Sequence, residues 1–146
     1  YKRINFKPND SRYRIGRGEQ GVLLVRPYTN DICQYWRFKT PADAMISATR
    51  ILFLYHIYKD KDDFVGMDMT RKFLEMGFTR ARRYANHKDG KKYDDNGNVK
   101  PQEKDWATSI KAKSAQIFKR ARDTVTKDPI YITMRKEWRA SENANI

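Results

Sequence analysis

The side chains of this sequence that are best suited to chemistry are cations gathered in one short run, from Thr79 to Lys88. The run reads Thr-Arg-Ala-Arg-Arg-Tyr-Ala-Asn-His-Lys. Arginine forks hold phosphates through paired hydrogen bonds, and an exposed tyrosine ring stacks on an unpaired base. The alternative is a solvated helix face whose arginines pair with Asp68 and Glu75, but two acids cannot neutralise so many cations. The run therefore indicates contact with nucleic acid.

Net positive charge is confined to three segments of the chain. Residues 1–17 carry +5, residues 71–92 carry +6 and residues 111–122 carry +5, while the rest sums to −3 and completes the total of +13. Concentrated charge repels itself, so a fold that tolerates it usually meets a polyanion. The predicted nucleic-acid contacts are Arg17, Arg71, Lys72, Arg80, Arg82, Arg83, His87, Lys88, Lys91, Lys92, Lys113 and Arg120.

Residue types for nucleophilic or metal chemistry are scarce. The chain has two histidines, His56 and His87, and one cysteine, Cys33, with no H-E-x-x-H or C-x-x-C spacing. His56 is expected in the core. His87 is either an exposed side chain without a role, or a residue that contacts phosphate or takes part in proton transfer. No catalytic residue, metal or cofactor is predicted.

A glycine-rich motif, G-x-G-x-x-G-x-V, spans Gly16 to Val22. A dinucleotide site would require a helix after it, but the apolar run from Val22 to Val25 predicts a strand, and the other motifs of a protein kinase are absent. The motif is therefore interpreted as a hairpin turn, with Arg17 at its tip available to a phosphate.

The pattern of apolar residues predicts an α+β fold that is mainly helical. Strands are expected at 13–15, 22–26 and 35–38, which would form a small antiparallel hairpin or sheet packed on about four helices. The helices are expected over 41–59, 63–86, about 101–126 and 129–139. Thr40-Pro41 and Asp128-Pro129 are typical helix starts. The helix over 41–59 is apolar on nearly every side and is expected at the centre of the bundle.

Length and composition favour one domain. The 146 residues suit a single core, divided into a β-rich arm over 1–39, a helical bundle over 40–140 with an exposed loop at 87–100, and a frayed tail at 141–146. The longest apolar run, Ile51 to Tyr55, is far short of a membrane span. A lone Cys33 fits a reducing compartment, so a soluble, cytoplasmic protein is expected.

Three blocks of the sequence resemble a known family. They are Tyr13 to Leu23, Trp36 to Pro41, and Asp63 to Met69 together with the run through Lys88. These blocks are similar to a family catalogued as a domain of unknown function, found in bacteria and in tailed phages, including phages of cyanobacteria. The resemblance covers roughly residues 10–95. It implies a cytoplasmic or phage-encoded origin and brings no activity, cofactor or partner.

Three functions remain open on the sequence alone. The first is a non-enzymatic nucleic-acid-binding protein that grips the phosphate backbone with little base specificity. The second is a structural or assembly protein, such as a virion component or host-factor binder, whose basic faces dock on an acidic protein surface. The third is a small metal-dependent nuclease that uses the segment 86–103, with His87 and acids from the set Asp89, Asp94, Asp95 and Glu103. The sequence does not distinguish DNA from RNA.

Overall fold

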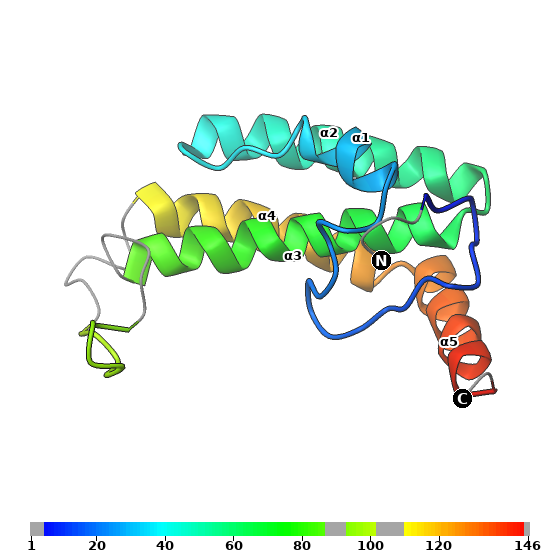
Figure 1. Cartoon of the computed structure of the whole chain (residues 1–146). Helices are drawn as coiled ribbons and strands as arrows, with labels where there is room; N and C mark the ends of the chain where they lie inside the picture. Colours follow the sequence, from blue (N-terminus) through cyan, green and yellow to red (C-terminus); the bar gives the residue numbers. More distant parts are fainter. Residues whose placement is uncertain (1–4, 87–92, 102–109, 145–146) are drawn as a thin grey trace.

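A computed structural model of the chain describes residues 5–86, 93–101 and 110–144. Its helices are α1 (Tyr28–Cys33), α2 (Pro41–Asp60), α3 (Phe64–Asn86), α4 (Ile110–Thr126) and α5 (Pro129–Ala144). Helices α2, α3 and α4 pack against one another as a bundle, and α5 turns away from the bundle axis beside the end of α4 (Figure 1).

The expected α+β fold is wrong, because the described residues form no strand, hairpin or sheet. Isolated bridges join Asn5 to Arg26 and Tyr93 to Val99, and nothing extends them. Between residues 22 and 25 the outer two valines are buried while Leu23 and Leu24 are exposed, which is the spacing of a turn rather than of a strand. The region expected to separate two strands is the short helix α1.

Side chains of α3 and α5 replace the hydrogen bonds that a sheet would have supplied to this arm. Lys72 Nζ donates to the carbonyls of Arg14 and Gln20, and Trp138 Nε1 donates to the carbonyl of Tyr13 at 3.1 Å. Gly16, Gly18 and Gly21 all have positive φ, so residues 16–21, which we call the glycine loop, coil tightly without a strand on either side. The backbone of this arm is thus satisfied in part by side chains that are distant in sequence.

Helix starts follow the expected capping chemistry. Thr40 caps α2 by accepting a hydrogen bond from the Asp43 N–H at 3.1 Å, with Pro41 at the first helical position. Asp63 caps α3 and also accepts a 2.6 Å hydrogen bond from the Tyr28 hydroxyl, which ties α1 to the start of α3. The expected helices over 41–59 and 63–86 are therefore confirmed.

Two other helix bounds differ from expectation. Helix α5 continues to Ala144, so the residues 141–144 that were expected to fray are helical. Helix α4 begins at Ile110 among the described residues, and the expected start near residue 101 falls next to residues 102–109, which lie outside them.

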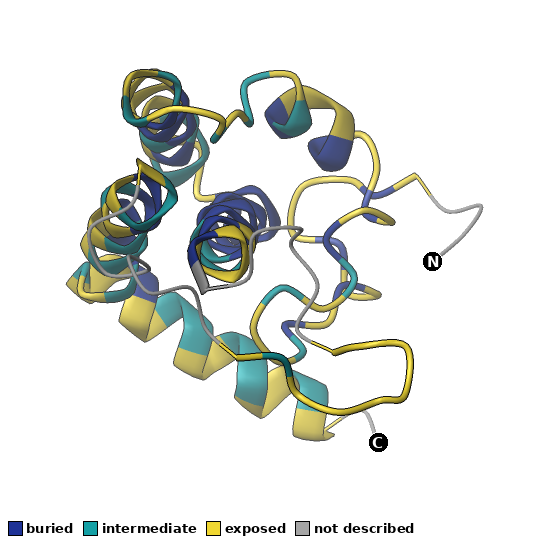
Figure 2. Ribbon diagram, turned by 90° about the vertical axis from the view of Figure 1, so that its left-hand side faces the viewer, coloured by how far each residue is buried: buried dark blue, intermediate teal, exposed yellow. Residues whose placement is uncertain are grey.

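The central helix of the bundle is α3, and the expectation for α2 is wrong. Every residue from Asp63 to Leu74 is buried, and Figure 2 shows this mostly buried helix in the middle of the molecule. Helix α2 instead leaves Met45, Ile46 and Phe53 more than half exposed. His56, expected in the core, is exposed on the same helix. Apolar residues on all sides therefore did not mean burial on all sides.

Gly77 sets the distance between α3 and α4, and this predicts the effect of adding one methyl group. A Cβ at Gly77 would lie 2.6 Å from Phe118 Cδ1, and Phe118 is fully buried. We expect Gly77→Ala to lower the free energy of unfolding by about 1–3 kcal/mol in urea denaturation, because overpacking outweighs the better helix propensity of alanine. In a Phe118→Leu background the same substitution should cost less, and an equal cost would show that this contact is not the cause.

Candidate nucleic-acid interface

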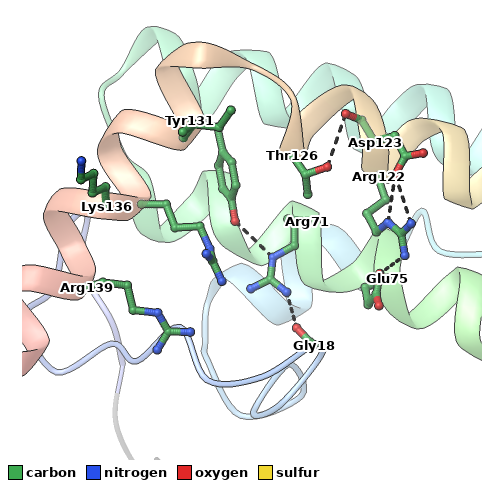
Figure 3. A pocket seen from close by; sticks show the side chains of 11 residues that line it. Gly18, Arg71, Glu75, Arg122, Asp123, Thr126, Tyr131, Lys136 and Arg139 are labelled. Carbon is green, nitrogen blue, oxygen red and sulfur yellow. Dashed lines mark hydrogen bonds and ion pairs between the residues drawn. The ribbon is translucent and has the colours of Figure 1, made fainter.

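An open pocket of about 700 Å³ lies between α3, the end of α4, α5 and the glycine loop (Figure 3). Five of its side chains are cationic and two are acidic, so an anion entering it meets excess positive charge. The lining residues are Gly18, Arg71, Glu75, Arg122, Asp123, Thr126, Tyr131, Ile132, Arg135, Lys136 and Arg139. We call this hollow the basic pocket.

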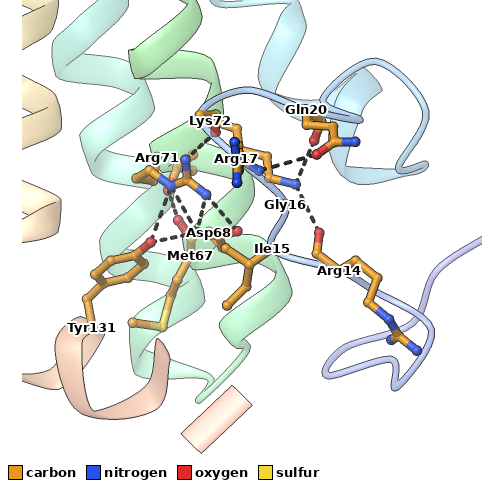
Figure 4. A network of polar contacts seen from close by, with 12 residues as sticks. Arg14, Ile15, Gly16, Arg17, Gln20, Met67, Asp68, Arg71, Lys72 and Tyr131 are labelled. Atoms are coloured by element: carbon orange, nitrogen blue, oxygen red, sulfur yellow. Dashed lines mark hydrogen bonds and ion pairs between the residues drawn. The ribbon is translucent and has the colours of Figure 1, made fainter. Parts of the chain in front are cut away.

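The inner wall of the basic pocket is built on a buried carboxylate, Asp68. It has no exposed surface and accepts hydrogen bonds from the hydroxyls of Tyr13 and Tyr131 and from Nε and one terminal nitrogen of Arg71 (Figure 4). Arg71 also donates to the Gly18 carbonyl, so it joins α3 to the glycine loop. The network fixes the position of Arg71 in the pocket wall.

The charges of this network keep Arg71 protonated. Burial, the largest single effect, would lower the pKa of Arg71, but the charge and hydrogen bond of Asp68 together with the neighbouring Tyr131 and Tyr13 outweigh it and raise the pKa above its ordinary value. Burial and the same carboxylate raise the pKa of Tyr13 and of Tyr131, so both tyrosines remain neutral donors. Arg71 is therefore a permanent cation whose guanidinium nitrogens already donate to groups inside the protein.

Lys72 lies behind this wall and does not reach the surface. It is fully buried, and its Nζ donates to the carbonyls of Arg14 at 3.1 Å and Gln20 at 2.8 Å while lying 4.6 Å from the centre of the Tyr13 ring. Burial lowers the pKa of Lys72 to about 8. A neutral amine still donates both hydrogen bonds, so deprotonation leaves the contacts intact.

The lowered pKa of Lys72 predicts that the protein becomes more stable as the pH rises from about 7.5 toward 9. The unfolded chain keeps this proton up to about 10.5, whereas the folded protein loses it near 8. The unfolded state binds more protons in that window, so the free energy of unfolding increases, by about 2 kcal/mol at most. Above about pH 9 the trend reverses, because the tyrosines whose pKa values are raised in the fold ionise first in the unfolded chain.

Urea denaturation between about pH 7.5 and 9 checks this prediction. A Lys72→Met variant is the control, since it is less stable throughout but has no lysine at this position to titrate. We expect the rise in the wild type and not in the variant. Equal slopes in both proteins would contradict the assignment to Lys72.

Arg122 and Arg139 line the basic pocket but already have partners. Arg122 forms ion pairs with Glu75 at 2.7 Å and Asp123 at 3.1 Å. Arg139 pairs with Glu142 at 3.3 Å and donates to the Gly16 carbonyl at 2.7 Å. Both retain partial exposure, so each can add a contact to an outside anion.

Arg135 and Lys136 differ from the other cations of the basic pocket. Among the residues that the structure describes, neither side chain has a hydrogen bond or an ion pair. Arg135 is half-buried and Lys136 is exposed, and both lie on α5. They are therefore the cations of this pocket whose charge is not paired with an acid within the described part of the fold.

A line of cations continues from the basic pocket onto the second half of α3. The guanidinium carbons of Arg82 and Arg122 lie 5.8 and 5.0 Å from the centre of the same ring, Phe78. Cation–π contact holds both arginines at this ring. Together the residues Arg82, Arg122, Arg135, Lys136 and Arg139 form what we call the basic stripe.

The structure places the predicted contact residues in three situations. Arg71 and Lys72 are buried and serve the internal network. Four others, His87, Lys88, Lys91 and Lys92, lie outside the described residues. The exposed ones are Arg17, Arg80, Arg82, Arg83, Lys113 and Arg120.

The exposed predicted residues do not gather on one face. At 100° per residue, Arg80 points about 160° away from Arg82, while Arg83 lies about 60° from Arg80. Lys113 and Arg120, two helical turns apart on α4, share the outer face of that helix. Of this set, Arg82 belongs to the basic stripe. The exposed predicted residues do not line a single groove.

Sequence reasoning missed the α5 side of the site. Between residues 123 and 146 acids and bases are equal in number, so net charge gave no signal there. In the fold Asp128 accepts hydrogen bonds from Tyr55 and Lys59, outside the pocket. Glu142 pairs with Arg139 and not with Arg135 or Lys136. The spacing of Arg135, Lys136 and Arg139, which shares one face of a helix, was the available signal.

Other chemistry is not assembled in the described part of the chain. No group of three or more His, Cys, Asp or Glu side chains there is arranged to hold a metal ion. Asp94 accepts hydrogen bonds from the N–H groups of Asn96 and Asn98 and so closes a turn, while Asp89 and Glu103 lie outside the described residues. None of the helices searched in these same parts has the length and apolar character needed to cross a bilayer.

The fold and the pocket define a small helical-bundle protein with a basic face. A model of the family described as a domain of unknown function (DUF4385) matches residues 1–141, and the chain belongs to that family. The resemblance to a family catalogued in this way is thereby confirmed. No curated protein and no solved structure matches the chain.

Proposed function

We propose that this protein binds nucleic acid by holding backbone phosphates along the basic stripe, with the basic pocket at its centre. The observation that carries the proposal is the pair Arg135 and Lys136, which line the pocket without a partner among the described residues. A phosphate placed there would meet these two cations first and the partly exposed Arg122 and Arg139 next. Such contacts read charge and not sequence, so base specificity should be slight.

The use of the acids inside the fold supports this proposal. Asp10, Asp68 and Asp128 are each occupied by an ion pair within the protein. Glu75 and Asp123 meet a single cation, Arg122. These five acids are therefore paired within the fold, which leaves the exposed arginines and lysines of α3, α4 and α5 in excess.

The lone cysteine supports a place for this activity in the reducing cytoplasm of a cell, or in a virion assembled there. Cys33 is a free, half-buried thiol in α1. Nucleic acid is abundant in both settings. The proposal assigns no reaction to the protein.

Fluorescence anisotropy with labelled 20-nucleotide DNA and RNA tests the proposal. With about five phosphate contacts, affinity should fall several-hundredfold between about 50 and 200 mM salt, and different sequences of one length should bind alike. Absence of binding at low salt would overturn the proposal, and so would tight binding that does not depend on salt. An acidic protein such as a poly-glutamate peptide serves as the competitor, and stronger binding to it would favour an assembly role instead.

A further inference from the structure

A second hollow, of about 720 Å³, lies at the end of the bundle where α2 begins and α3 ends. Figure 1 shows the start of α4 at this same end, far from α5. Its lining residues are Trp36, Arg37, Phe38, Lys39, Asp43, Tyr84 and Lys111. We call it the aromatic pocket. Its size suits a single nucleotide.

Aromatic rings form a fixed platform in the aromatic pocket. The ring centres of Trp36 and Phe38 are 4.9 Å apart, and those of Phe38 and Tyr84 are 6.3 Å apart with planes tilted by 36°. Trp36 is held by a 3.1 Å hydrogen bond from Nε1 to the Phe73 carbonyl and by edge contact with the Phe73 ring. Tyr84 is 41% exposed, so part of its ring is open to solvent. Such a ring is held in place to receive a flat partner.

Cations surround this platform. Lys111 Nζ lies 5.8 Å from the centre of the Phe38 ring and 5.9 Å from that of Tyr84, and it donates to the Lys39 carbonyl at 2.7 Å. Burial and the nearby charge of Lys39 lower the pKa of Lys111, so a neighbouring anion would stabilise its charged form. Arg37 and Lys39 are exposed at the rim, and Asp43 is the single acid of the lining.

We infer that the aromatic pocket binds one base of a single-stranded nucleic acid, stacked on the Tyr84 ring, with the flanking phosphates held by Lys111 and the rim cations. Rings interleaved with cations match an unpaired nucleotide, which has a flat apolar face and a negative backbone. Bases within a duplex are covered by their neighbours and offer no such face. This inference rests on the proposed function and adds a preference for single strands.

Anisotropy with a 12-nucleotide single strand and the matching duplex, both at one salt concentration, tests the inference. Tyr84→Leu keeps the bulk and the charge of the protein while removing the ring. We expect it to weaken single-strand binding roughly tenfold, to leave duplex binding unchanged and to leave the salt slope unchanged. Tyr84→Phe should bind like the wild type, because stacking needs the ring and not the hydroxyl.

Phe53→Leu is the matched control, since Phe53 is an exposed aromatic on α2 outside this pocket and should show no change. If Tyr84→Leu has no effect, or weakens single strand and duplex equally, the inference fails while the proposed function stands. If neither strand form binds in a salt-dependent way, both fail together. Circular dichroism of each variant separates a loss of binding from a loss of fold.

Discussion

Replacing Asp68 with asparagine is expected to lower the free energy of unfolding by about 3–5 kcal/mol, because it removes one partner of a buried ion pair. The carboxylate has no exposed surface and is the shared acceptor for Arg71, Tyr13 and Tyr131. Asparagine has nearly the same shape but is neutral, so it leaves the buried Arg71 guanidinium without its counter-charge. The amide N–H groups of asparagine would also face the O–H and N–H groups that now donate to Asp68, so donor would meet donor.

Urea denaturation at neutral pH, followed by circular dichroism, measures this effect. Asp95→Asn is the control, because Asp95 is exposed and its substitution should change stability by less than about 0.5 kcal/mol. In the double variant Asp68→Asn with Arg71→Met we expect part of the loss to be recovered, because the unpaired cation is gone. A cost for Asp68→Asn as small as that of the control would show that the network does not hold the pocket wall.

Neutralising Arg135 and Lys136 together is expected to weaken nucleic-acid binding on the order of a hundredfold at about 50 mM salt. These cations line the basic pocket, and their side chains have no ion pair or hydrogen bond in the described part of the protein. Two fewer phosphate contacts should also flatten the plot of log Kd against log salt by about 1.4 for a single strand and about 1.8 for duplex DNA. Both are partly or fully exposed, so Arg135→Gln with Lys136→Gln should leave stability nearly unchanged.

The pair Arg50→Gln with Lys61→Gln removes the same net charge from α2 and its C-terminal cap, which do not contribute to the basic pocket. We expect this control to weaken binding only severalfold, through the long-range field. Equal losses in the two double variants would mean that overall charge drives association and that the basic pocket is not a distinct site.

Local chemistry made the helices predictable. Thr40-Pro41 begins α2, and Asp128 beside Pro129 begins α5, where the Ile130 N–H donates to the Asp128 carboxylate at 3.0 Å. A cap depends on residues two or three positions apart, so the sequence contains all that it needs. The 23 residues of α3 were likewise indicated by one continuous periodic segment.

The N-terminal arm could not be predicted, because its partners are distant in sequence. Its short apolar runs are compatible with strands, and a strand requires another strand to satisfy its backbone. In this protein Lys72 and Trp138 supply those hydrogen bonds from helices about 58 and 125 positions away. The sequence pattern counted Lys72 as surface charge and gave no sign that either side chain reaches the arm.

The same reason explains which charges were placed correctly. Arg82 and Arg120, which the sequence predicts as nucleic-acid contacts, are exposed, because helical periodicity separates outer from inner faces. Lys72 shares a helix with Arg82 but lies under the glycine loop, a contact that no local pattern reveals. Arg135 and Lys136 were overlooked because nearby acids cancel their charge along the chain, although Asp123, Asp128 and Glu142 pair with other cations in the fold.

Arginine side-chain NMR during a titration with a 20-nucleotide single strand tests most directly whether the basic stripe holds phosphates. We predict that the Nε–Hε signals of Arg82 and Arg135 shift as the nucleic acid saturates the protein and return when salt is raised. The Arg71 signal should stay in place, since its Nε is held by Asp68 and Tyr131. A saturated complex in which the signals of Arg82 and Arg135 have not moved would contradict nucleic-acid binding at this face.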